Sequence, residues 1–161
     1  MSASTSKPVV LITGGGIGIG RSTGHAFGKA GYHVVVTDVL EREGQAVVGE
    51  IEAAGGSAEF HLLNVRSTPE SDALVASLTE RFGAIDCIVA NAGIAHKVPL
   101  PVLTDEKWDH TFDIDLKGIF RVVRPALAGM KARKSGAIVA LSSIMGVAYG
   151  WDEHVHYSAA K

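Results

Sequence analysis

Short runs of apolar, often β-branched residues alternate along the chain with longer segments of helical period. The runs are Val9–Ile12, His33–Thr37, Ala58–Leu62, Ile85–Ala90 and Ala137–Leu141. Several of them are apolar throughout, which is typical of strands that helices cover on both faces. Strands that alternate with helices predict repeated βαβ units, and therefore an α/β fold around a parallel sheet.

One helical segment has both a start signal and an apolar face. Ser67 and Pro69 supply a capping hydroxyl and a proline in the first turn, and together they mark a helix start. Leu74, Leu78 and Phe82 then recur every four residues, so they fall on one side of the helix. This pattern predicts a helix that packs on the sheet.

The longest periodic segment runs from Thr104 to Lys131. Its apolar residues recur every three or four positions and are Trp108, Phe112, Leu116, Phe120, Val123, Leu127 and Met130. We interpret this stripe first as core packing and second as a subunit contact. Pro125 should kink the helix.

Composition excludes several classes of protein. The 161 residues suit one domain, and 47% hydrophobic with 20% charged residues exclude a disordered or coiled-coil chain. The formal charge of −2 offers no basic excess for nucleic acid. The single Cys87 and the lack of a membrane-length apolar run favour a cytoplasmic protein with no membrane partner. We interpret the polar residues 1–7 as a disordered lead-in.

A glycine-rich loop directly follows the first predicted strand and precedes a helix. A helix N-terminus offers unpaired N–H groups to a pyrophosphate, and glycines remove the Cβ atoms that would keep phosphates away. The spacing T-G-x-x-x-G-x-G is matched by Thr13, Gly14, Gly18 and Gly20, with Gly16, Ile17 and Ile19 among the intervening residues. The phosphate loop of nucleotide hydrolases is disfavoured, because it needs Lys where Arg21 stands. We therefore predict a dinucleotide cradle.

An acidic residue at the end of the second predicted strand selects the dinucleotide. Asp38 lies 24 residues after Gly14, where a carboxylate accepts hydrogen bonds from the adenosine ribose and repels a 2′-phosphate. Val39 and Leu40 follow it, and neither is basic. We expect NAD to be bound in preference to NADP.

Tyr157 and Lys161 lie four residues apart, which places them side by side in a helix. A free phenol titrates at about 10, so a tyrosine that exchanges a proton near neutrality needs a neighbour that favours the phenolate. The lysine ammonium is such a neighbour. Ser143 ends a predicted strand 14 residues before Tyr157, and its hydroxyl could hydrogen-bond the same substrate oxygen.

Taken in order, these motifs resemble the short-chain dehydrogenase/reductase family, from Val9 to the last residue. Further matching residues are Val65 after the third predicted strand and Asn91, Ala92 and Gly93 after the fourth. The resemblance implies a Rossmann-type, doubly wound parallel sheet with NAD(P) at its switch point. It also implies hydride transfer between the nicotinamide and a carbinol carbon.

The resemblance assigns roles to individual residues. Tyr157 would be the acid/base and would also contact the cofactor, and Ser143 would hold the substrate oxygen. Lys161 would bind the nicotinamide ribose while favouring the phenolate. Asn91 would support the fourth strand beside the adenosine. A homodimer or tetramer formed through the 104–131 helix is also implied.

Two positions depart from the family pattern. Asp115 stands where the family usually has Asn in a proton relay to the lysine, and we expect the relay to persist with an altered pH dependence. Asn64 stands where the family often has Asp beside the adenine amine, and its amide oxygen can still accept that hydrogen bond.

Together these observations predict an NAD-dependent oxidoreductase that interconverts a secondary alcohol and a ketone or aldehyde. The apolar character of the loops around Met145 and Trp151 favours a small-molecule substrate with a hydrophobic body. No metal is expected, since His154 and His156 lack further ligands. The alternatives are a catalytically impaired dinucleotide-binding regulator of the same fold, motivated by Asp115, and a phosphate-loop nucleotide hydrolase.

The chain ends at Lys161, inside the helix that carries the predicted catalytic pair. With no further strand beside it, Ala137–Leu141 would be an open apolar edge, which invites aggregation. We expect residues 1–161 to be the NAD(P)-binding part of a longer single domain that is C-terminally incomplete here.

Overall fold

The computed structural model describes residues 7–161, so the predicted lead-in lies outside the described residues except for Lys7. Five parallel strands form one sheet in the order β3-β2-β1-β4-β5. The strands are β1 (Val9–Thr13), β2 (His33–Asp38), β3 (Ser57–Leu62), β4 (Cys87–Ala90) and β5 (Ala137–Ala140). All five predicted strands are confirmed, with bounds that differ by one or two residues.

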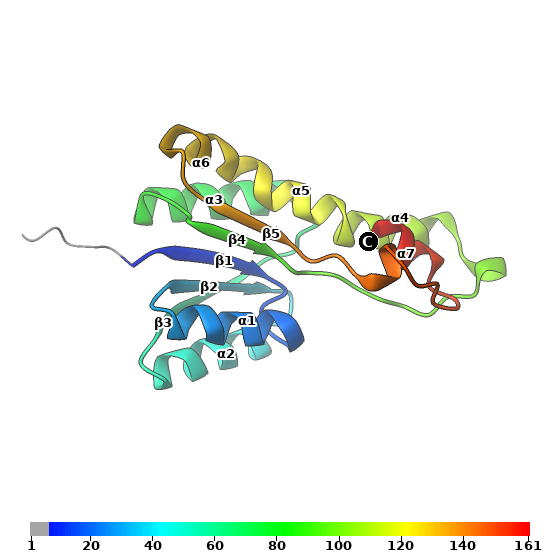
Figure 1. Cartoon of the computed structure of the whole chain (residues 1–161), viewed down its shortest axis with the longest axis horizontal. Coiled ribbons are helices and arrows are strands. Elements are labelled where there is room, and N and C mark those ends of the chain that lie inside the picture. The colour runs from blue at the N-terminus through cyan, green and yellow to red at the C-terminus, as the bar shows by residue number, and fades with distance from the viewer. Residues whose placement is uncertain (1–6) are drawn as a thin grey trace, which may run out of the picture.

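Helices cover both faces of the sheet, as Figure 1 shows. On one face lie α1 (Gly18–Lys29) and α2 (Glu41–Ala53), and on the other α3 (Thr68–Phe82), α5 (Lys117–Val123) and α6 (Leu127–Arg133). Beyond the carboxyl ends of the strands, α4 (Asp105–Asp115) and α7 (Val155–Ala160) pack together. The 3-10 turns are η1 (Leu100–Val102), η2 (Arg124–Ala126) and η3 (Ile144–Gly146). The expected doubly wound α/β fold is confirmed.

The central strand contributes to two separate cores. Val9 and Leu11 of β1 pack in the cluster that includes α3 and α5, whereas Val10 and Ile12 pack in the cluster that includes α2. All four side chains are buried, because successive residues of a strand point to opposite faces. This explains why the strand is apolar throughout.

The start signal of α3 works as the sequence predicts. Ser67 caps the helix, and its side chain accepts a hydrogen bond from the Glu70 amide at 3.3 Å. Pro69 occupies the first turn, where its missing N–H costs no helical hydrogen bond. The helix ends at Gly83, whose φ of 78° is left-handed.

The predicted 104–131 helix is broken into α4, α5, η2 and α6. The first break is at Leu116, and the second is the 3-10 turn that contains Pro125, where proline lacks the N–H that a continuing helix needs. Our first interpretation of its apolar stripe is wrong for three residues, because Leu116, Phe120 and Leu127 are exposed. The buried side of α4 instead carries Thr111 and Asp115.

Two further features of the described part of the chain bear on function. Within residues 7–161, no helix is long and apolar enough to cross a membrane. β5 forms one edge of the sheet, and its apolar residues Ile138 and Val139 are exposed there.

Candidate functional site

A cavity of about 480 Å³ opens where the carboxyl ends of β1, β2 and β4 meet. Its wall consists of Gly14, Ile17, Gly18, Ile19, Asp38, Val39, Leu40, Leu63, Asn64, Val65, Asn91, Ala92, Gly93, Ile94 and Ile114. Most of the predicted cofactor residues therefore line one cavity. It lies where open α/β sheets bind their ligands.

The glycines of the loop are required by close backbone contacts. Gly14 and Gly18 have φ of 62° and 56°, a left-handed conformation that glycine adopts without strain. A Cβ on Gly20 would overlap the Gly14 carbonyl oxygen, and one on Gly14 would lie 2.8 Å from the Ala92 Cα. Side chains at these positions would push the loop out of shape and narrow the cradle.

Thr13 and Asn91 join the glycine loop to the end of β4. The Thr13 hydroxyl accepts hydrogen bonds from the Asn91 and Ala92 amides, both at 3.1 Å. The Asn91 side-chain amide donates to the Thr13 and Gly14 carbonyls at 3.0 and 2.9 Å. These polar groups hold the cavity wall in place, which extends the supporting role that the sequence predicts for Asn91.

Asp38 is buried at the end of β2 and already accepts two hydrogen bonds. One carboxylate oxygen accepts from the Gly16 amide at 2.9 Å and the other from the Leu40 amide at 3.0 Å. Each oxygen keeps lone-pair capacity toward the cavity, since a carboxylate can accept about four hydrogen bonds. Gly16 is not part of the cavity wall; it orients Asp38.

Asn64 and Val65 form the part of the wall that follows β3. The Asn64 side-chain oxygen accepts a hydrogen bond from the Arg66 amide at 3.0 Å, so its own turn uses part of the acceptor capacity that we assigned to an adenine amine. The Asn64 backbone amide donates to Glu70 at 3.0 Å. Val65 is buried and presents an apolar surface.

Lys161 lies just outside the cavity, against Gly93. A Cβ on Gly93 would lie 3.2 Å from the Lys161 ammonium and 3.1 Å from Asp115 Oδ2. The ammonium donates to the Leu141 carbonyl at 3.0 Å and lies 3.5 Å from Asp115 Oδ2. It is also 5.8 Å from the centre of the Tyr157 ring. The end of β4 thus brings the cavity and the predicted catalytic pair together.

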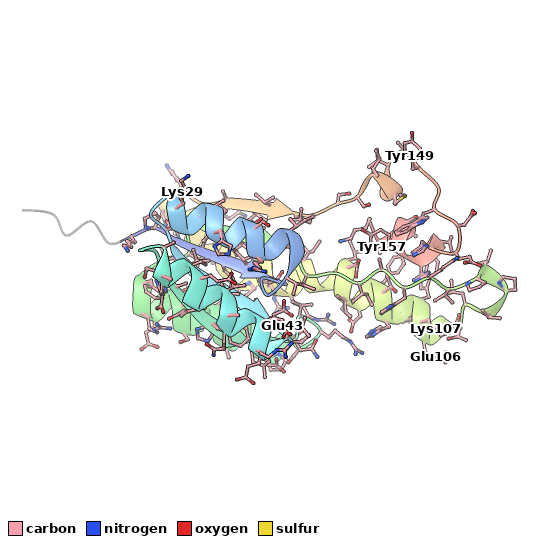
Figure 2. The ribbon with its side chains drawn as sticks, turned by 90° about the horizontal axis from the view of Figure 1, so that it is seen from below. Lys29, Glu43, Glu106, Lys107, Tyr149 and Tyr157 are labelled. Carbon is pink, nitrogen blue, oxygen red and sulfur yellow. The ribbon has the colours of Figure 1, made fainter. Side chains whose placement is uncertain are left out.

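The two serines after β5 have different contacts. Ser143 caps η3, and its hydroxyl accepts from the Met145 amide at 3.2 Å, which leaves its own proton available as a donor. Ser142 instead donates to the Lys161 carbonyl at 2.8 Å. In Figure 2, Tyr149 lies at the outer end of the following loop, and Tyr157 lies between this loop and α4.

Burial has the largest effect on the pKa values of Asp115 and His156. It raises the pKa of Asp115, although the Ile94 amide at 2.9 Å and the Lys161 ammonium partly oppose the shift. Burial also lowers the pKa of His156, and neither of its ring nitrogens has a hydrogen-bond partner among the described residues. No group of three His, Cys, Asp or Glu side chains within residues 7–161 could hold a metal ion.

Four wall residues, Leu40, Leu63, Ile94 and Ile114, were not predicted to bind the cofactor. Ile94 directly follows the predicted Gly93. Leu40 and Leu63 each adjoin a predicted residue at a strand end, and that position was the signal that could have identified them. Ile114 lies between two residues of the apolar stripe on α4 and gave no signal. Thr13, Gly16, Gly20, Tyr157 and Lys161 were predicted to bind the cofactor and lie outside the cavity wall itself.

Comparisons with known proteins agree with this arrangement. The family model for short chain dehydrogenases matches residues 8–161. A 3-oxoacyl-(acyl-carrier-protein) reductase FabG of Thermotoga maritima is 33% identical over 95% of this chain and 62% of its own length. A (5R,7aS)-5-hydroxy-7a-methyl-1-oxo-2,3,5,6,7,7a-hexahydro-1H-indene-carboxyl-CoA reductase of Mycobacterium tuberculosis is 36% identical over 96% and 60%.

A solved structure gives the same result. A metagenomic short-chain oxidoreductase in complex with NADP superimposes with a TM-score of 0.91 and 30% identity, over 96% of this chain and 70% of that one. The chain spans about three-fifths of the length of the two curated relatives.

Proposed function

The chain belongs to the short chain dehydrogenase family, and on this premise we propose that the protein is an NAD-dependent oxidoreductase that interconverts a secondary alcohol and a ketone or aldehyde. One observation carries the proposal. Gly93 of the cavity wall lies so close to Lys161 and Asp115 that a Cβ on it would be 3.2 and 3.1 Å from their side chains, so a dinucleotide in the cavity would reach Lys161 and, through it, Tyr157.

The cavity fits a dinucleotide. Gly14, Gly18 and Gly20 form a backbone cradle at the N-terminus of α1, where amide groups and the helix dipole favour a pyrophosphate. The cavity volume of about 480 Å³ lies in the range of small-molecule sites. The bound nicotinamide would supply the hydride acceptor or donor.

The side chains around Tyr157 supply the proton chemistry. In the oxidising direction, the Tyr157 phenolate takes the proton of the substrate hydroxyl, and in the reducing direction the phenol returns it. Ser143 donates a hydrogen bond to the same substrate oxygen and holds it in place. The Lys161 ammonium, 5.8 Å from the Tyr157 ring, stabilises the phenolate.

Asp38 supports a preference for NAD over NADP. Its carboxylate is fixed by the Gly16 and Leu40 amides and can accept ribose hydroxyls, but it would repel a 2′-phosphate. The solved relative that carries NADP makes this preference a point to measure in this protein. Titrating NADH and NADPH fluorescence gives both dissociation constants directly.

The loop after β5 supports an apolar substrate. Val147, Tyr149 and Trp151 are all exposed in it, and the loop joins Ser143 to the helix that carries Tyr157. The substrates named for the two curated relatives are an oxoacyl group and a bicyclic oxo compound, and both have hydrophobic bodies. We therefore propose a small carbonyl or alcohol with a hydrophobic body as the substrate class.

The exposed side chains Leu116, Phe120 and Leu127 also support our proposal that copies of the protein associate through the 104–131 segment, as a dimer or tetramer. Apolar side chains that gather on one exposed face are typical of such contacts. Sedimentation analysis of the purified protein tests this proposal.

The alternative, a dinucleotide-binding regulator without turnover, was motivated by Asp115 and is not favoured by the similarity to reductases. The phosphate-loop hydrolase is abandoned, since the family match leaves it no support. The test is a Tyr157→Phe substitution, assayed by NADH titration and by turnover of a panel of secondary alcohols. The proposal predicts loss of turnover with NADH affinity kept. Binding without turnover in the unchanged protein would favour the regulator, and loss of NADH affinity in the variant would contradict the role of Tyr157.

A further inference from the structure

A buried arginine lies behind the cavity wall and belongs to no predicted motif. Arg121 of α5 is only 6% exposed. Its guanidinium donates to the Thr68 hydroxyl at 3.2 Å, to the Val65 carbonyl at 3.3 Å and to the Asp113 carbonyl at 2.9 Å. It also forms an ion pair with the Asp113 carboxylate. This one side chain therefore joins α5 both to the end of α4 and to the turn at residues 65–68, which lies 53 to 56 residues earlier in the sequence.

The ion pair explains how a buried guanidinium is tolerated. A buried charge needs a partner and hydrogen bonds for its remaining donors, and Asp113 supplies both a carboxylate and a carbonyl. Burial would raise the pKa of Asp113, but hydrogen bonds from Arg121 and Arg66 outweigh burial and lower it. Arg66, which directly follows Val65, donates to the same carboxylate at 2.9 Å.

The cluster of Arg121, Asp113 and Arg66 holds Val65 on the side away from the cavity. A Cβ on Gly118, also in α5, would lie 2.9 Å from Val65 Cγ2, so the helix backbone packs directly against the valine. Arg121 fixes the Val65 carbonyl, and Asp113 holds Arg66. Val65 and Asn64 line the cavity, whereas Arg121 and Gly118 do not.

We propose that Arg121 is a positioning residue for the adenosine half of the dinucleotide. It fixes residues 63–66 as a preformed wall, so that binding does not have to order this turn. The inference rests on the proposed dinucleotide site. The nicotinamide half lies toward Gly93 and Lys161, which are held by other contacts, so it does not depend on Arg121.

The two halves of the dinucleotide provide the test. ADP-ribose carries the adenosine half, and reduced nicotinamide mononucleotide carries the other, so calorimetric titration of each reports one end of the site. The variants are Arg121→Met, which removes every donor, and Arg121→Lys, which keeps a charge for Asp113 but lacks the fork that also reaches Val65. The matched control is Arg124→Met, because Arg124 lies on the next turn and joins α3 through an exposed ion pair with Asp72 at 2.8 Å.

We expect Arg121→Met to weaken ADP-ribose about tenfold or more, since it leaves the Val65 carbonyl without its partner. Arg121→Lys should weaken it by a smaller factor and is the decisive variant if Arg121→Met does not fold. Both should change nicotinamide mononucleotide affinity less than about twofold, and Arg124→Met should leave both ligands unchanged.

The outcomes separate this inference from the function beneath it. Equal weakening of both ligands in Arg121→Lys, or no weakening of either, overturns the inference and leaves the dinucleotide site standing. If the unchanged protein binds neither ligand, the proposed function fails and the inference fails with it.

Discussion

Replacing Asp115 by asparagine removes a buried negative charge and keeps the shape of the side chain. Asp115 is fully buried, with one oxygen bonded to the Ile94 amide at 2.9 Å and the other 3.5 Å from the Lys161 ammonium. The second oxygen has no hydrogen-bond partner among the described residues. The substitution tests whether the attraction to Lys161 or the burial of the carboxylate has the larger effect on the free energy of unfolding.

Two opposing free energies decide which effect is larger: the attraction between Asp115 and Lys161, and the cost of removing the carboxylate from water. At 3.5 Å, an effective dielectric constant of about 20 gives an attraction of about 5 kcal/mol. Removing a carboxylate from water also costs several kcal/mol. Burial is the largest influence on the pKa of Asp115, and the pKa is raised with Lys161 in place. Burial therefore outweighs the attraction, so folding disfavours the charged form of Asp115 relative to its ionisation in the unfolded chain.

The sign of the pH dependence follows from this shift. As pH rises above the ordinary range for Asp, the unfolded chain loses its proton first, so the folded protein loses stability until pH passes the raised pKa of Asp115. The amide of the Asp115→Asn variant does not titrate. The variant should therefore match the unchanged protein in acid and exceed it in free energy of unfolding at pH 7, by on the order of 1 kcal/mol.

Urea unfolding of both proteins from pH 4 to 8 measures this difference. If the unchanged protein is the more stable one at pH 7, the ion pair outweighs burial and the reasoning is refuted. Turnover provides a second readout under the proposed function. Without the negative charge, Lys161 favours the Tyr157 phenolate more strongly, so the acid limb of kcat/KM should move to lower pH.

Two further substitutions test other parts of the molecule. Burial would raise the pKa of Glu59, but hydrogen bonds from Arg81 and His61 outweigh it and lower the pKa from 4.5 to about 2. Glu59→Gln should therefore cost roughly 1–3 kcal/mol of unfolding free energy at pH 6, and this cost should fade between pH 4.5 and 2. An equal cost at pH 6 and pH 2 would contradict the prediction. The control is Glu52→Gln, at an exposed position. Asp38→Asn removes the negative charge that would repel a 2′-phosphate, and it places an amide where Gly16 or Leu40 donates. The ratio of the NADPH to the NADH dissociation constant should therefore fall about tenfold. An unchanged ratio would remove the basis for the NAD preference.

Local signals predicted the sheet and the glycine loop, because their causes lie within a few residues. An apolar run such as Val9–Thr13 is buried on both faces, and this follows from strand geometry alone. Gly14 and Gly18 adopt the left-handed backbone for which glycine is suited. In each case the residue types and their spacing are enough to predict the local backbone structure.

Long-range polar contacts could not be predicted in this way. Arg121 and the Val65 carbonyl are 56 residues apart in the sequence, and no local pattern connects them. The hydrogen bonds that the Gly16 amide donates to Asp38 and that the Asn91 side chain donates to the Gly14 carbonyl likewise form only when the strands are paired. The positions of the site residues were therefore predictable, whereas the contacts that hold them were not.

The 104–131 segment shows why periodicity alone misassigned a helix face. Hydrophobic spacing assumes that the buried side is the apolar side, yet α4 buries Asp115 and Thr111, and α5 buries Arg121. Thr111 bonds to the Lys107 carbonyl of its own helix, but the two charged groups also have partners from outside the segment. These are the Ile94 amide and Lys161 for Asp115, and the Val65 carbonyl for Arg121. Because those partners form the cavity wall and the region around the catalytic pair, the polar side of the segment faces the site and the apolar residues Leu116 and Phe120 face outward.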